Sequence, residues 1–333
     1  MTRISRRTFS RRGVAAFSGA AAIGSFSIAR AQARTLRFGT IWPATGAWAD
    51  GVTEFANAVK ARSNGALDVR VFPASQLGNE RELEEGLQLG NLDFTFGGPG
   101  VLTNFDPKIG IFDMPFMFRD YAQSTKVMDG PIGQEVWDSM REKAGIRVLS
   151  SGAQGFRYVL TRSKAISKLD DIKGQKIRTP EAETFLRTFR LLGANPVGVP
   201  FGETYLAVKN GVVDGMEGVP DVMVNLKFFE VGKFIARTGH IMATLQMLVS
   251  EKTYQSLSPE HRKIVDEEAT RAWHKQRDDA KIGNEKAEQT LAQQGCQFTN
   301  VDLPAFQAAV RPLWDEWGKK TGMEKTIEAI QKS

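Results

Sequence analysis

The chain of 333 residues is poor in the side chains that bind metal ions or form cross-links. A single cysteine, Cys296, excludes an internal disulfide and disfavours a cysteine-based metal cluster. The three histidines are scattered: His240 stands alone, and His261 and His274 lie 13 residues apart, too far along one helix to ligate a common ion. We therefore predict a protein without a metal site and without a bound cofactor.

The sequence motifs of common enzymes are also missing. There is no G-x-S-x-G nucleophile turn, no phosphate-binding P-loop, no H-E-x-x-H helix and no G-x-G-x-x-G turn. Gly97 to Gly100 follow an expected strand, but Pro99 lacks the backbone N–H that a phosphate-binding turn would use, which favours a ligand-facing turn. The acidic pair Asp214 and Glu217 is equally explained by a turn after a helix. We predict that the protein is not an enzyme.

Acidic residues are absent from the first 33 residues, which contain six arginines and no lysine. Ser5 to Arg11 read S-R-R-T-F-S-R, which fits the twin-arginine export pattern. Val14 to Ile28 supply a modestly apolar stretch, and Ala31-Gln32-Ala33 supplies a small-x-small cleavage site. A membrane anchor is the alternative, but the stretch is too short and too rich in Gly and Ala. We predict a twin-arginine signal peptide over residues 1–33, cleaved near Ala33, and a periplasmic protein.

The excess of positive charge lies in this segment. The whole chain has a formal net charge of +6, but removing these six arginines from the 44 Lys and Arg leaves 38 basic against 38 acidic residues. A neutral chain without basic and aromatic clusters disfavours nucleic acid as a partner. Past residue 33 there is also no run of 18 apolar residues, which disfavours a transmembrane helix.

From residue 34 onward, short apolar runs alternate with amphipathic segments, which is typical of an α/β protein. In a first set we expect strands at 35–40, 67–72, 93–96 and 146–151, and helices at 50–63, 79–89 and 131–143. In a second set we expect strands at 157–161, 176–179, 195–199 and 243–250, and helices at 182–192 and 202–210. A last helical pattern covers 259–294, begins after the N-cap candidate Ser258 and ends at Gly295.

The most informative stretch begins in the second α/β set with G-Q-K-I-R-T-P-E at 174–181. It continues through L-G-A-N-P-V-G-V-P-F-G-E-T-Y at 192–205 to G-V-V-D-G-M-E at 211–217. Further motifs are F-P-A-S-Q-L-G at 72–78, F-D-M-P-F-M-F at 112–118 and G-F-R at 155–157. In this order the motifs resemble the solute-binding proteins of TRAP transporters, the tripartite ATP-independent periplasmic family of DctP type, from about Leu36 to the C-terminus.

The resemblance implies an α/β, two-lobed periplasmic binding protein fold with hinge strands and a long helix spanning both lobes. We expect residues 34–153 plus about 244–283 in the first lobe, and residues 154–243 plus about 284–333 in the second. The resemblance also implies capture of a small organic acid between the lobes and delivery to the TRAP membrane permease subunits. We expect the protein to act as a monomer.

Two arginines match ligand-binding positions of that family. Arg178 matches the arginine that grips the ligand carboxylate, and its planar guanidinium suits bidentate binding of a carboxylate. The alternative is a surface arginine in an exposed ion pair, which contributes at most about 1 kcal/mol. Arg157 matches a second arginine near the ligand, and its alternative is a salt bridge that stabilises the hinge.

Other candidates follow from the same resemblance. Phe201 matches an aromatic residue that packs on the ligand, with a core phenylalanine as the alternative. Trp42, at the end of the first strand, is placed to face the cleft or to close the edge of the core. The remaining positions at which family members often contact ligand are Asn79, Pro99 and Glu181.

One position departs from the family pattern. After Asp-Gly-x-Glu the family commonly has an asparagine that helps the arginine to hold the carboxylate, but this chain has Gly218. A glycine offers only backbone groups and extra room, so the ligand could differ from C4-dicarboxylates or sialic acid. Two rival functions stay open at this point: an exported enzyme acting on organic acids, and a sensory protein that receives a ligand with the same fold.

Overall fold

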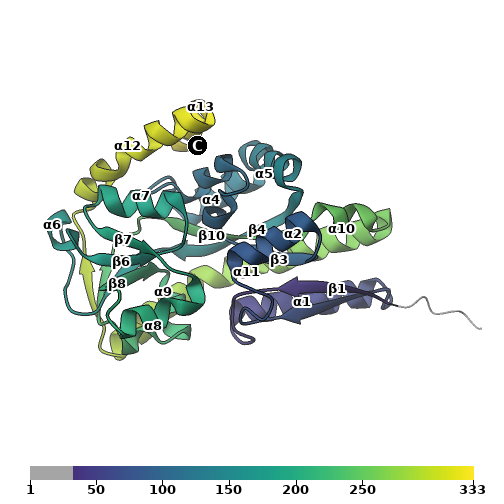
Figure 1. Cartoon of the computed structure of the whole chain (residues 1–333), viewed down its shortest axis with the longest axis horizontal. Coiled ribbons are helices and arrows are strands. Elements are labelled where there is room, and N and C mark those ends of the chain that lie inside the picture. The colour runs from purple at the N-terminus through teal and green to yellow at the C-terminus, as the bar shows by residue number, and fades with distance from the viewer. Residues whose placement is uncertain (1–32) are drawn as a thin grey trace, which may run out of the picture. The chain divides into compact units, whose positions relative to one another are not determined.

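The computed structural model describes residues 33–333, so the predicted signal peptide lies outside the described residues except for Ala33. The described chain contains two separate β-sheets (Figure 1). The first has five strands in the order β2-β1-β3-β10-β4. Its strands are β1 (Arg34–Gly39), β2 (Leu67–Phe72), β3 (Phe94–Gly97), β4 (Ile146–Phe156) and β10 (Met242–Ser250).

The second sheet has six strands in the order β11-β9-β5-β8-β6-β7. Its strands are β5 (Tyr158–Thr161), β6 (Lys176–Thr179), β7 (Asn195–Gly198), β8 (Gly215–Gly218), β9 (Phe234–Arg237) and β11 (Gln297–Asn300). Both sheets mix parallel and antiparallel pairs. The two sheets, each with its own helices, confirm the predicted two-lobed α/β fold.

Two paired strands carry the chain between the sheets. β4 and β10 are antiparallel from Ile146 and Ser250 to Phe156 and Met242. Directly beyond β4, the amide of Arg157 donates to the carbonyl of Ile241 at 2.9 Å. β5 then begins at Tyr158 in the second sheet. The lobes are thus joined by two adjacent crossings, which is the arrangement of a hinge.

Helices cover both sheets. Around the first sheet lie α1 (Ala47–Arg62), α2 (Glu80–Leu89), α3 (Pro99–Leu102), the 3-10 helix η1 (Pro107–Asp113), α4 (Tyr121–Asp129), α5 (Pro131–Ala144) and α10 (Glu251–Ser256). Around the second lie α6 (Leu169–Ile172), α7 (Glu183–Leu191), η2 (Phe201–Glu203), α8 (Thr204–Lys209), α9 (Pro220–Asn225) and η3 (Phe228–Glu230). None of the helices in residues 33–333 is both long and apolar enough to cross a membrane.

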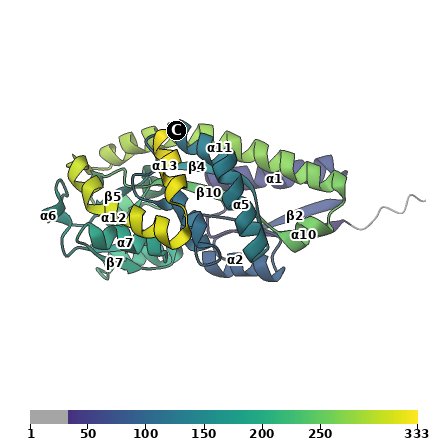
Figure 2. The same ribbon diagram turned by 90° about the horizontal axis from the view of Figure 1, so that it is seen from above.

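The long helix α11 (Pro259–Gln293) confirms the helix predicted from the sequence. Ser258 caps it, because its hydroxyl accepts from the amide of His261 at 3.2 Å. Trp273 of α11 is fully buried in the core of the first lobe, and Leu291 is fully buried in a core of the second. Figure 2 shows α11 running beside α1 and past β4 and β10.

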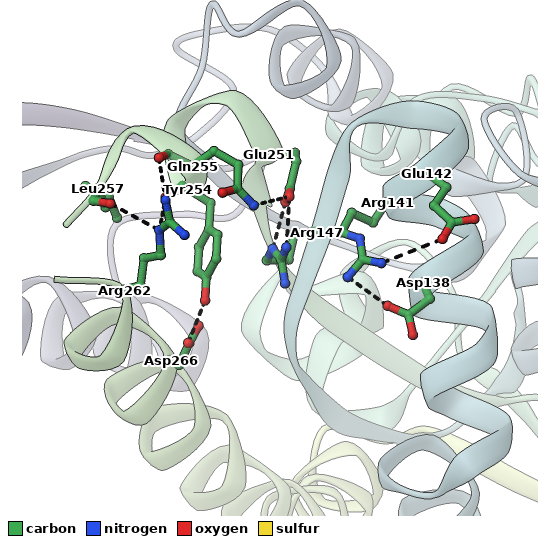
Figure 3. Close-up of polar contacts among 10 residues, drawn as sticks. All are labelled: Asp138, Arg141, Glu142, Arg147, Glu251, Tyr254, Gln255, Leu257, Arg262 and Asp266. Carbon is green, nitrogen blue, oxygen red and sulfur yellow. Dashed lines mark hydrogen bonds and ion pairs between the residues drawn. The ribbon is translucent and has the colours of Figure 1, made fainter. Parts of the chain in front are cut away.

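The short helix α10 is held between β4 and α11 by polar contacts (Figure 3). Arg147 at the start of β4 donates to both carboxylate oxygens of Glu251 at 2.7 and 2.8 Å. The hydroxyl of Tyr254 lies 2.7 Å from a carboxylate oxygen of Asp266 in α11. The guanidinium of Arg147 also lies 4.2 Å from the centre of the Tyr254 ring. These contacts fix the start of α11 to the first sheet.

The last two helices, α12 (Leu303–Thr321) and α13 (Glu324–Lys332), contact buried residues of both lobes. Phe306 and Val310 pack in a core beneath the second sheet. Trp314 and Trp317 pack in the first-lobe core that also holds Trp137. The assignment of residues 284–333 to the second lobe stays a prediction.

Candidate functional site

A cavity lies between the two sheets and is lined by residues of both. It contains about 680 Å³ of empty space, including the part that opens to solvent. From the first sheet and its helices it receives Trp42, Glu80, Pro99, Asp113 and Thr244. From the second sheet and its helices it receives Arg157, Arg178, Phe185, Phe201, Glu217 and Gly218. Most of the predicted site residues therefore meet in one place.

Arg178 projects from β6 and is 2% exposed. Its Nε and Nη2 atoms both donate to the carbonyl oxygen of Val199, at 2.9 and 2.6 Å. No carboxylate among residues 33–333 forms an ion pair with it, so the predicted alternative of an exposed ion pair does not describe this residue. Burial lowers the pKa of Arg178 to about 10, which still leaves it protonated at neutral pH.

Arg157 follows the hinge strand β4 and is held by Glu217 of β8. Its Nη2 donates to Glu217 Oε1 at 2.7 Å, and its Nε donates to Glu217 Oε2. Burial alone would raise the pKa of Glu217, but Arg157 and the hydrogen bond from His240 hold it at about 2. Arg157 thus lines the cavity and also forms the hinge salt bridge named as its alternative, so most of its charge is compensated.

His240 lies behind this pair and is completely buried. Its Nε2 is 3.3 Å from Glu217 Oε2, and its Nδ1 is 2.7 Å from the hydroxyl of Thr238. Burial lowers the pKa of His240, so a neutral ring donates to Glu217. Glu217 is therefore part of a strand and a buried polar network, and the predicted turn after a helix is wrong for this residue.

Two aromatic side chains meet across the cavity. The rings of Trp42 and Phe201 are 5.0 Å apart between their centres. Trp42 also stacks on Phe96 of the first-lobe core at 6.3 Å. The guanidinium of Arg178 lies 6.0 Å from the centre of the Phe201 ring. Both aromatic residues are half-buried, so they combine the two predicted roles of lining the cavity and closing the edge of a core.

The other predicted positions divide between the cavity and its outer part. Pro99 is the first residue of α3 and lines the cavity, as Gly218 of β8 does. Asn79 caps α2, because its side chain accepts from the amide of Glu82 at 3.0 Å. Asn79 and Glu181 line an adjoining hollow that shares Arg178 and Phe201 with the cavity.

Sequence reasoning missed two acidic residues of the first lobe, Glu80 and Asp113. Glu80 opens α2, and its Oε1 accepts from the amide of Gly98 at 3.0 Å. Asp113 ends η1 and is 2% exposed. Burial raises the pKa of Asp113 to about 7, although Arg157 opposes this shift. Asp113 lies within the F-D-M-P-F-M-F motif, which could have marked it as a candidate.

This arrangement suits binding of a small anion. Arg178 supplies a buried positive charge, the aromatic pair supplies apolar surface, and Glu80 and Asp113 can accept hydrogen bonds from hydroxyl groups. Among residues 33–333 no group of three or more His, Cys, Asp or Glu side chains is placed to hold a metal ion.

Known proteins that are similar to this chain are solute-binding proteins. Residues 38–321 match the DctP family model, described as bacterial extracellular solute-binding protein, family 7. The chain is 30% identical over 291 residues to the 2,3-diketo-L-gulonate-binding periplasmic protein YiaO of Escherichia coli K12, covering 87% of this chain and 88% of that protein.

Solved structures extend this similarity to three dimensions. A TRAP periplasmic solute-binding protein from Polaromonas sp. JS666, bound to D-erythronate, has a TM-score of 0.85 and 32% identity, covering 89% of this chain and 98% of that one. The sugar acid binding protein DctPAm of Advenella mimigardefordensis, in complex with galactonate, has a TM-score of 0.85 and 28% identity, covering 90% and 96%.

Proposed function

This chain belongs to the DctP family, family 7 of the bacterial extracellular solute-binding proteins, and we propose that it captures a small organic acid in the cavity between its lobes. The ligand carboxylate binds Arg178, and the cavity closes around the rest of the molecule. The closed protein then delivers the acid to the membrane permease subunits of a TRAP transporter. Closure is favoured because the ligand has more contacts in the closed state.

This proposal depends mainly on the buried charge of Arg178, which has no ion-paired counter-charge in the described part of the chain. Among residues 33–333 this buried guanidinium donates to one backbone carbonyl and forms no ion pair, which is costly, since buried charges are ordinarily paired. A ligand carboxylate in the cavity supplies the missing counter-charge and leaves the fold otherwise unchanged. Arg157 contributes less, because Glu217 already compensates it.

The chemistry of the first lobe narrows the ligand class. Glu80 and Asp113 line the same cavity as Arg178, and a second ligand carboxylate there would meet like charges. Hydroxyl groups, in contrast, can donate to both side chains. We propose a monocarboxylate with a hydroxylated body, in line with the D-erythronate and galactonate bound by the similar structures. Gly218 leaves room on the side of the second lobe.

The remaining features of the proposal concern the setting of the protein. We propose that the twin-arginine segment exports the chain to the periplasm, in line with the periplasmic relatives, and that the mature protein is monomeric. We propose that it has no enzymatic activity. A sensory role would need the same cavity, and a pull-down against the permease subunits or a membrane kinase separates these two roles.

Removing the charge of Arg178 tests the proposed function. We expect Arg178→Ala to weaken binding by at least about a hundredfold, because losing one partner of a buried ion pair costs about 3–5 kcal/mol. Calorimetry with D-erythronate, D-galactonate, D-glucuronate and D-galacturonate measures the affinity, and native mass spectrometry of the purified protein identifies any retained acid. Arg190→Ala, on the exposed side of α7, is the matched control and should bind normally. Near-wild-type affinity of Arg178→Ala would overturn the assignment.

A further inference from the structure

The charges that line the cavity do not balance. Arg157 and Arg178 face three carboxylates, those of Glu80, Asp113 and Glu217. Glu217 is paired with Arg157, so this pair contributes little net charge. Among residues 33–333 Arg178 forms no ion pair, and the remaining carboxylates of the cavity are Glu80 and Asp113. A ligand carboxylate would bring a third negative charge into a space where only one positive charge is uncompensated.

Among these carboxylates, the ionised form of Asp113 is the least favoured by its surroundings. Asp113 and Phe185 both pack closely against Gly100. The position that a Cβ atom on Gly100 would occupy lies 3.1 Å from Asp113 Oδ2 and 3.0 Å from the Phe185 ring. Arg157 is the positive group that acts on Asp113, while Glu217 and Glu80 are the negative groups and the amide of Gly100 is its backbone partner. The side chain is thus buried close to the Phe185 ring, with more negative than positive neighbours.

Glu80 is better placed to remain ionised than Asp113. Burial raises the pKa of Glu80, but the amide of Gly98, from which it accepts, and the charges of Arg178 and Arg157 oppose this shift. A neighbouring acid, Glu84, is fully buried, and neither of its oxygens has a hydrogen-bond partner among residues 33–333. The position that a Cβ atom on Gly97 would occupy lies 2.6 Å from Glu84 Oε1 and 3.2 Å from Glu80 Oε1. These two oxygens are therefore no more than 5.8 Å apart. Burial raises the pKa of Glu84 well above its usual range, so a neutral acid already lies behind Glu80.

We propose that Asp113 takes up a proton when the cavity closes on the ligand, so that the protein binds an organic anion together with a proton. This inference rests on the proposed function, because it needs an anionic ligand at Arg178. The proton comes from the solvent and stays on the Asp113 carboxyl group, which can then donate a hydrogen bond to a ligand hydroxyl. No other bond is made or broken.

The direction of the pH effect follows from linkage. Without a ligand the pKa of Asp113 is about 7, and a bound anion raises it further. Below about pH 7 the free protein already carries the proton, so its affinity changes little with pH. Above this range each binding event must also bind a proton, so the affinity falls as the pH rises, by at most about tenfold per pH unit. We expect about three- to tenfold weaker binding at pH 8.5 than at pH 6.5.

Calorimetry measures this uptake directly. The tightest-binding acid among D-erythronate, D-galactonate, D-glucuronate and D-galacturonate is titrated at pH 7.5 in phosphate and in Tris, whose ionisation enthalpies differ strongly. We expect the apparent binding enthalpy to differ between the buffers by the amount that a net uptake of a fraction of a proton requires. Zero uptake or net proton release in the wild type would overturn the proposal, whatever the variants do.

Three variants assign the proton to its residue. Asp113→Asn should abolish both the uptake and the fall in affinity at high pH. Glu80→Gln should retain the uptake, whatever its affinity. Asp278→Asn, on the exposed face of α11, removes a carboxylate outside the cavity and should behave as the wild type. Uptake that persists in Asp113→Asn, or that disappears in Glu80→Gln alone, would overturn the assignment to Asp113.

The two proposals fail in different ways. If Arg178→Ala binds acids as tightly as the wild type, the proposed function fails. If binding depends on Arg178 but is independent of pH and buffer, only the proton uptake fails.

Discussion

The buried acid Glu84 shows how one side chain can work against the stability of this fold. It is fully buried, both its oxygens lack hydrogen-bond partners in the described part of the chain, and burial raises its pKa well above the usual range. We expect Glu84→Leu, which is similar in volume, to raise the free energy of unfolding by about 1–3 kcal/mol at pH 8, since it removes an unsatisfied polar group.

The stability gained by Glu84→Leu should increase with pH. The unfolded state ionises Glu84 near its ordinary pKa of about 4.3, whereas the folded state keeps it protonated, so the folded protein loses stability as the pH rises above this value. The benefit of Glu84→Leu should therefore be smaller at pH 5 than at pH 8. Urea unfolding at both pH values measures it, with Glu85→Leu on the same helix, whose side chain is 45% exposed, as the control. A destabilised Glu84→Leu at both pH values would show that the carboxyl has a stabilising role.

Individual site residues were predictable only where a motif in the neighbouring sequence marks them. Arg178 lies in a recognisable motif, and an arginine is the side chain that suits a carboxylate, so the sequence could mark it. Glu80 and Asp113 are different. Their contacts with Gly98 and Gly100 form only in the folded chain. A motif marks Asp113 as a candidate at most, and no local pattern marks Glu80. The partner of Arg157 was missed for the same reason, because Glu217 lies 60 residues further along the chain.

At the scale of elements, segments with a regular pattern were predicted, including the four-residue strand β6 at 176–179, whereas β8 and α12 were not. The helix expected at 259–294 is α11, with its N-cap at Ser258. β8 has only four residues, two of them glycine, so its sequence suggested a turn. α12 contains Pro312 in its interior, where a proline normally marks a helix end, so this helix was not expected. Tertiary packing of Trp314 and Trp317 outweighs the local cost of that proline.

The connection of α11 to the hinge leads to a prediction at this scale. Asn284 of α11 donates to the carbonyl of Gln154 in β4 at 2.7 Å and accepts from the amide of Asp221 in α9 at 3.1 Å. Asn284→Ala leaves both backbone groups without this partner, so we expect it to lower the free energy of unfolding by about 1–3 kcal/mol.

Asn225→Ala is the matched control for this change. Asn225 is exposed and bonds only to the side chain of Asp221, at 2.9 Å, so we expect a loss within about 0.5 kcal/mol. Urea unfolding compares the two variants. Equal losses would mean that the contact of Asn284 with the hinge is not a significant source of stability.

At the scale of the whole described chain, ligand affinity and closure are one equilibrium. The two sheets are joined by β4 and β10, and the cavity residues come from both sides of this hinge. Any contact between the lobes that exists only in the closed state therefore adds to ligand affinity without touching the ligand. We expect the ring pair of Trp42 and Phe201, with centres 5.0 Å apart, to be such a contact.

Phe201→Ala tests this coupling. An aromatic pair contributes about 0.5–1.5 kcal/mol beyond its buried area, so we expect the variant to bind acids at least about three- to tenfold more weakly. The fold should persist, because Phe201 is only half-buried. Small-angle scattering of the free and acid-saturated protein should show a smaller fraction of compact molecules for Phe201→Ala at equal ligand concentration. Phe229→Ala, a half-buried aromatic of the second lobe outside the cavity, is the control. If both variants bind equally well, the contact between Trp42 and Phe201 does not stabilise the closed state.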